Sequence, residues 1–109
     1  MKRLEKSNKY QNIFCLILPF IISIVVYLNC LSNSFVYDDE STIINNYFIR
    51  HWSNFPYIFT SKYFSLSAEL TYRPVVTVSY FIDYTFWHLN SSGYHLTNVL
   101  LHAINSILV

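Results

Sequence analysis

The sequence is poor in glycine, cysteine and charged residues. Its single glycine, Gly93, excludes the glycine-rich loops that bind nucleotide phosphates, because the G-x-G-x-x-G and P-loop patterns both need more than one. Its two cysteines exclude a framework of several disulfides. Charged residues are 12% of the chain, against about 25% in soluble domains, and a formal net charge of +1 provides no basic surface for nucleic acid. These shortages indicate a membrane protein, or part of one, with no nucleic-acid partner.

The chain is rich instead in apolar side chains, which make up 53% of its 109 residues. Residues 13–31 form an uncharged run that, at about 1.5 Å per helical residue, nearly spans the roughly 30 Å hydrocarbon core of a bilayer. We predict a transmembrane helix there. No alanine occurs before residue 68, so an A-x-A cleavage site is missing and we expect the helix to remain as an anchor.

Basic residues are concentrated just before this helix, in residues 1–12. The positive-inside rule places that end in the cytoplasm. The loop that follows, residues 32–93, is therefore predicted to lie on the extracytoplasmic side of a bacterial inner membrane or of the endoplasmic reticulum.

The rest of the chain is predicted to form short helices and loops rather than strands. Ser41 or Thr42 is expected to cap a helix that runs through Phe48. Pro74 suits the first position of a helix over about 74–89, whose aromatic residues favour the membrane surface. The segment Asn90–Gly93 is predicted to be a turn.

Residues 94–109 are again apolar and helical in pattern, but they are too short for a full membrane span. We interpret them as the start of a second transmembrane helix that is cut short. The predicted fold class is therefore an all-α membrane protein, with the chain forming the N-terminal fragment of a polytopic helical protein.

Two groups of residues could carry chemistry. The adjacent acids Asp38 and Asp39 either mark a helix start or form a catalytic acid site, in which one carboxylate accepts a proton from an attacking hydroxyl. In a helix or turn their side chains diverge, so one could face a substrate and the other a divalent metal or an orienting partner. Arg73 either pairs with lipid headgroups or binds the phosphate of a lipid carrier through its bidentate fork.

Other polar residues give weaker signals. His95 and His102 lie seven positions apart, on one face of the second helix, but two histidines do not make a metal site and we assign no metal ligand. Asp83 and Glu69 are expected at the rim of the molecule. Glu69 precedes Arg73 by four residues and is expected to pair with it.

Three blocks occur in order along the chain: F-x-Y-D-D at residues 35–39, Y-R-P at residues 72–74 and G-Y-H-L-x-N-x-L-L-H at residues 93–102. Together with the N-terminal anchor, they resemble the start of GT-C glycosyltransferases. The resemblance is strongest to the transmembrane O-mannosyltransferase-like proteins with tetratricopeptide repeats and to their bacterial relatives, and it extends from about residue 33 to residue 109.

The resemblance implies a protein with many transmembrane helices that uses a sugar carried on a polyprenyl or dolichyl phosphate and transfers it to a protein or glycan acceptor. It implies that Asp38 is the catalytic base and that Asp39 has an orienting or metal-related role. From the other two blocks we assign Tyr72, Arg73 and His95 to substrate binding, with Arg73 at the lipid phosphate. The helices and the repeat domain expected after residue 109 are missing, so we expect this fragment to be inactive alone.

A second hypothesis is a small membrane protein without catalysis, either a truncated product or an assembly partner. In that case the acids would start a helix and the aromatic residues would form an interface belt.

Overall fold

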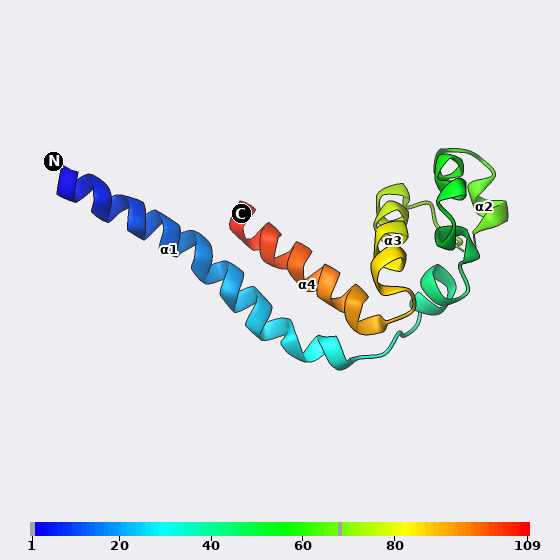
Figure 1. Cartoon of the computed structure of the whole chain (residues 1–109), viewed down its shortest axis with the longest axis horizontal. Helices are drawn as coiled ribbons and strands as arrows, with labels where there is room; N and C mark the ends of the chain where they lie inside the picture. Colours follow the sequence, from blue (N-terminus) through cyan, green and yellow to red (C-terminus); the bar gives the residue numbers. More distant parts are fainter. Residues whose placement is uncertain (1, 68) are drawn as a thin grey trace.

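The computed structural model describes residues 2–67 and 69–109, with side chains described from residue 9 onward. Every regular element in these ranges is helical (Figure 1), so the prediction of an all-α fold is confirmed. In chain order the elements are α1 (Lys2–Tyr27), η1 (Leu28–Ser32), η2 (Glu40–Ile44), η3 (Tyr47–Arg50), η4 (Trp52–Phe59), α2 (Tyr63–Leu66), α3 (Pro74–Trp87) and α4 (Ser91–Leu108). η2 is one turn of π-helix, and η1, η3 and η4 are 3₁₀-helices.

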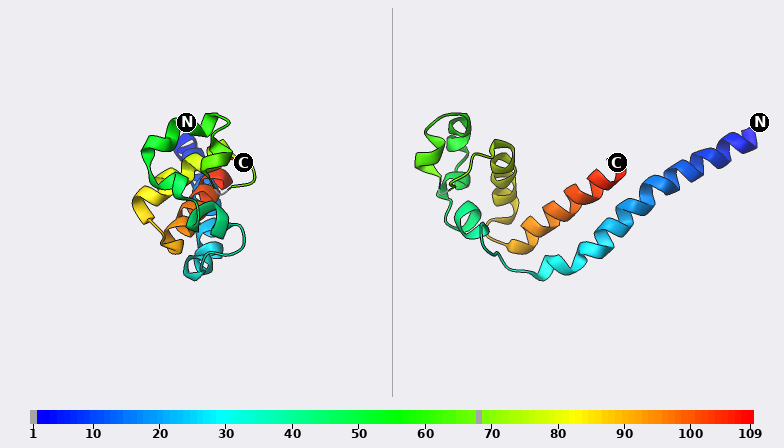
Figure 2. Two further views of the ribbon diagram at one scale, coloured as in Figure 1. Left: turned by 90° about the vertical axis from the view of Figure 1, so that its right-hand side faces the viewer. Right: turned by 180° about the vertical axis from the view of Figure 1, so that it is seen from behind.

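α1 and α4 lie side by side and antiparallel, and η1 continues α1 and packs against α4. The remaining helices gather in a loop region beyond one end of this pair (Figures 1 and 2). Near that end the Tyr27 ring meets the His102 imidazole edge-on, with 4.9 Å between the ring centroids. Within the described residues, Lys9–Ser32 is the one helical segment long and apolar enough to cross a membrane. It includes the span predicted at 13–31. α4 does not meet the same criterion, so the second span stays a prediction.

The loop region is built around a buried aromatic and aliphatic cluster. Its members come from five of the short helices and from the start of α4: Ile43, Phe48, Ile49, Ile58, Tyr63, Phe81 and Tyr94. Phe81 is fully buried on α3, with its ring centroid 5.7 Å from that of Phe48 and 5.3 Å from that of Trp52. The Trp52 indole N–H donates to Thr85 Oγ1 at 2.9 Å, which fixes η4 against α3. Packing, rather than helix propensity, therefore holds these short elements, since helices of this length are marginal alone.

The two ends of the loop region are in contact with each other. The main-chain carbonyl of Asn33, just after η1, accepts hydrogen bonds from Ser91 Oγ at 2.9 Å and from His95 Nε2 at 3.1 Å. We call this contact the Asn33 clasp. A second link joins the last two helices, because Thr97 Oγ1 on α4 donates to Asp83 Oδ1 on α3 at 2.7 Å.

The predicted cap at Ser41 or Thr42 is wrong. Both hydroxyls donate backward to the carbonyl oxygen of Asp38, at 3.0 and 2.9 Å, which is the alternative that Ser and Thr side chains offer to N-capping. The chain makes the π-helical turn η2 there. The next helix, η3, starts after Asn46, whose side-chain oxygen accepts from the Phe48 N–H at 3.1 Å.

The predicted turn at Asn90–Gly93 is also misplaced. α4 begins at Ser91, and the Asn90 side chain caps it by accepting from the Ser92 N–H at 3.1 Å. The reversal lies earlier, after α3 ends at Trp87, where His88 has a φ of 53°. Gly93 is buried inside α4 and lies directly against Trp87. It is required for this close approach and not for a turn.

Candidate functional site

The acid pair lies in a tight turn between η1 and η2. Tyr37, directly before it, has a φ of 50°, a conformation that residues with a side chain adopt uncommonly. The Asp39 N–H donates to the Val36 carbonyl at 3.1 Å, and Asp39 Oδ2 accepts from the Val36 N–H at 3.2 Å. Asp39 thus closes the turn with both its main chain and its side chain. The Asp38 side chain is exposed.

The two acids line different pockets. Asp38 lines a pocket of about 200 Å³ whose other residues are Ser41, Thr42, Leu70, Thr71 and Arg73. We call it the Asp38 pocket. Asp39 instead lines a cavity of about 40 Å³, together with Asp83, His95 and Asn98 among others. Residues from two of the blocks recognised in the sequence, Asp38 and Arg73, therefore line one pocket although they are far apart along the chain.

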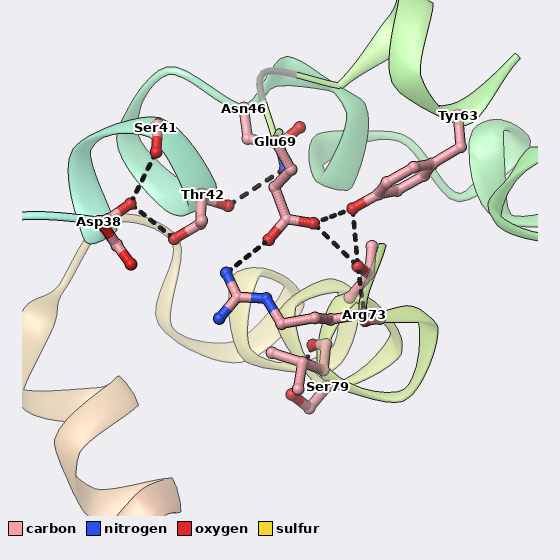
Figure 3. Close-up of polar contacts among 10 residues, drawn as sticks. Asp38, Ser41, Thr42, Asn46, Tyr63, Glu69, Arg73 and Ser79 are labelled. Carbon is pink, nitrogen blue, oxygen red and sulfur yellow. Dashed lines mark hydrogen bonds and ion pairs between the residues drawn. The ribbon is translucent and has the colours of Figure 1, made fainter. Parts of the chain in front are cut away.

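Arg73 directly precedes α3, whose first residue is Pro74 as predicted. Its guanidinium pairs with the Glu69 carboxylate, with Nη2 3.3 Å from Oε1, which confirms the expected pairing (Figure 3). The two side chains differ in environment, because that of Arg73 is 41% exposed while that of Glu69 is fully buried. Arg73 thus contributes a cation to the lining of the Asp38 pocket and is paired with a buried anion.

Glu69 belongs to a polar network inside the loop region. Its Oε2 accepts from the Tyr63 hydroxyl and from Thr77 Oγ1, the latter at 3.2 Å, and the two hydroxyls lie 3.0 Å from each other (Figure 3). Burial raises the pKa of the Glu69 carboxyl above its ordinary value, and the hydrogen bond from Thr77 and the charge of Arg73 oppose this rise only in part.

Glu69 and Asp83 are not rim charges, which corrects the expectation from sequence. Their residues are only 3% and 4% exposed. Burial raises the pKa of the Asp83 carboxyl, and the hydrogen bond from Thr97 partly counteracts it. The spacing of Glu69 and Arg73 was the only sequence signal for this network. The partners Tyr63, Thr77 and Thr97 carried no signal of their own.

Neither Tyr72 nor His95 lines the Asp38 pocket. The Tyr72 ring packs against Tyr63 and Phe64, with centroid distances of 5.7 and 5.9 Å. His95 takes part in the Asn33 clasp and also lines a third pocket, of about 260 Å³, between the end of α1 and α4. His102 lines the same pocket, which agrees with the shared helix face expected from the spacing of the two histidines.

No group of three or more His, Cys, Asp or Glu side chains that could hold a metal ion occurs within the ranges that the structure describes. What the site offers is a carboxylate, Asp38, and a guanidinium, Arg73, at one open pocket. A carboxylate can accept a proton, and a guanidinium can bind an anion.

Comparison with known proteins points to one group. Over 94% of this chain, a protein O-mannosyl-transferase of Caenorhabditis elegans is 28% identical. The human protein O-mannosyl-transferase TMTC2 is 33% identical over 75% of the chain, and its Drosophila melanogaster counterpart is 29% identical over 98%. The chain is thus a distant homologue of TMTC-type protein O-mannosyl-transferases.

The chain spans only 16%, 10% and 12%, respectively, of the length of these three relatives. No family model matches it. No solved structure matches it either.

Proposed function

We propose that this chain forms the N-terminal part of an integral-membrane glycosyltransferase of GT-C type. The enzyme transfers a sugar from a polyprenyl- or dolichyl-phosphate carrier to a hydroxyl of a protein or glycan acceptor on the extracytoplasmic side. The similarity to protein O-mannosyl-transferases supports the reaction class. The single structural observation that carries the proposal is that Asp38 and Arg73 line the same pocket.

In the proposed reaction Asp38 takes the proton of the acceptor hydroxyl while the hydroxyl oxygen attacks the anomeric carbon of the carried sugar. A carbon–oxygen bond forms between acceptor and sugar, and the bond between the sugar and the carrier phosphate breaks. The bonding electrons leave with the phosphate, whose negative charge Arg73 stabilises. A single displacement of this kind inverts the configuration at the anomeric carbon.

The other residues assigned from the sequence have supporting roles in this proposal. Asp39 holds the turn that carries Asp38, through its bonds to the main chain of Val36. Tyr72 packs beside the entrance of α3, and His95 fixes the start of α4, so both shape the surroundings of the pocket rather than its chemistry.

The test is a transfer assay on the complete reading frame that encodes this chain, in membranes, with dolichyl-phosphate mannose as donor and a serine- and threonine-rich peptide as acceptor. Asp38→Asn should lower kcat by about 10²–10⁴-fold, the usual contribution of a positioned general base. Glu40→Gln is the matched control, because Glu40 is an exposed acid two residues away that is absent from the Asp38 pocket. Full activity of Asp38→Asn would contradict the role of Asp38 as the base, whereas no transfer by the wild type would favour the non-catalytic alternative.

A further inference from the structure

The two oxygens of the Glu69 carboxylate have different hydrogen-bond partners. One oxygen, Oε1, faces Arg73. The other, Oε2, accepts from the hydroxyls of Tyr63 and Thr77 (Figure 3). Because Tyr63 comes from α2 and Thr77 from α3, the position of the carboxylate is fixed from two separate elements.

Thr77 also holds the main chain of Arg73. Its N–H and its Oγ1 both contact the Arg73 carbonyl, at 2.9 and 3.0 Å. The main chain of Arg73 and one nitrogen of its guanidinium are thus held by the same network, while the side chain remains 41% exposed at the Asp38 pocket. A long, flexible cation is therefore ordered before any ligand arrives.

We propose that Glu69 is the positioning residue that orders the Arg73 guanidinium, so that the N–H groups it leaves exposed receive the phosphate of the carrier in the Asp38 pocket. This inference rests on the proposed function and adds a residue to it. Glu69 does not touch the substrate and acts only through Arg73.

Two physical effects of Glu69 on anion binding oppose each other. An ordered guanidinium binds a phosphate more tightly, because less side-chain freedom is lost on binding. A nearby carboxylate, however, lowers the positive potential that attracts the phosphate. Ordering outweighs charge here, because the Glu69 side chain is fully buried and its carboxylate also accepts from the hydroxyls of Tyr63 and Thr77.

The experiment measures binding of farnesyl phosphate to the product of the complete reading frame that encodes this chain, in phosphatidylcholine nanodiscs, by titration calorimetry, with farnesol as the uncharged control. Glu69→Gln keeps the size of the side chain and removes its charge, and it should weaken binding about tenfold, within the range seen for contacting groups. Glu69→Asp keeps the charge but withdraws it by one methylene, and it should weaken binding as well. If Glu69→Gln does not fold, as judged by tryptophan fluorescence, Glu69→Asp decides.

Two controls separate positioning from a general structural effect. In an Arg73→Gln background, Glu69→Gln should cause no further loss, because its effect passes through Arg73. Tyr63→Phe removes only one of the two hydroxyl donors that fix the carboxylate and keeps its charge, so it should weaken binding less than Glu69→Gln does.

A readout without ligand keeps the two proposals distinguishable. The ¹⁵N order parameter of Arg73 Nε should fall in Glu69→Gln, since an unpaired guanidinium moves more freely. If wild type binds farnesyl phosphate and Glu69→Gln binds it as tightly or more tightly, the role of Glu69 is overturned and the proposed function stands. If wild type binds no farnesyl phosphate, the assigned phosphate site fails, and an order parameter that still falls limits Glu69 to ordering Arg73.

Discussion

Replacing Gly93 with alanine tests how closely α3 and α4 approach each other. An alanine Cβ at this position would lie 2.3, 2.4 and 2.6 Å from Cγ, Cδ2 and Cβ of Trp87. Contacts below 3.0 Å require a neighbour to move. These atoms belong to the base of the indole side chain, close to the main chain, so a simple rotation of the ring does not relieve the overlap.

The expected magnitude follows from two opposing contributions. Alanine is favoured over glycine in a helix interior by about 1 kcal/mol. Overpacking a buried site costs about 1–3 kcal/mol, and three overlaps at one residue argue for the upper end of that range. We therefore expect Gly93→Ala to lower the free energy of unfolding of the loop region by about 2 kcal/mol, the difference between these terms.

The assay is equilibrium urea unfolding in detergent micelles, followed by the fluorescence of Trp52 and Trp87, which both lie in the loop region. Ser92→Ala is the matched control, because Ser92 is the exposed neighbour in the same helical turn and should change stability by no more than about 0.5 kcal/mol. A Gly93→Ala chain as stable as wild type, or more stable, would refute the close packing of Trp87 on α4.

Three further predictions concern the core, a buried acid and the topology. Phe81→Ala removes a fully buried ring and should cost about 3–5 kcal/mol in the same unfolding assay, whereas Phe86→Ala on the same helix, at 73% exposure, should cost much less. Asp83→Asn retains an acceptor for Thr97 and should make the loop region more stable than wild type near neutral pH. Because burial raises the pKa of Asp83 in the folded state, wild type should lose stability as the pH rises from the ordinary value of 3.8 through the raised one. The variant should show a smaller slope, to which Glu69, whose pKa is also raised, still contributes. Ser53→Cys, in a chain whose native cysteines are replaced by serine, should react with an impermeant maleimide added to the extracytoplasmic side of sealed membranes; labelling only from the cytoplasmic side would reverse the predicted orientation.

The features that the sequence predicted correctly are those indicated by a long apolar run or by a single residue that restricts the main chain. The uncharged run at 13–31 falls within an unbroken apolar helical segment, and Pro74 starts α3, because a long apolar pattern and a proline restrict the main chain locally. The short elements were harder to predict. Ser41 and Thr42 bond backward instead of capping a helix, a choice that depends on the turn at Asp38.

The burial of charge was the least predictable part of the site. A glutamate or aspartate usually has a solvated side chain. Glu69 and Asp83 are nevertheless buried, and Thr77 and Thr97 supply hydroxyl donors to them from helices that come later in the chain. The meeting of Asp38 and Arg73 at one pocket is likewise a tertiary event. Residue chemistry alone suggested each as a candidate, and only the resemblance of the sequence blocks suggested that both serve one reaction.

The Asn33 clasp gathers two segments 58 residues apart onto a single oxygen atom. The loop region between these two segments is thus joined to the α1–α4 pair at the Asn33 clasp. When a bilayer thickens or the helices tilt, we expect the main chain at the Asn33 clasp to change its conformation. The loop region then moves as a unit, and the arrangement of Asp38 and Arg73 within it does not change.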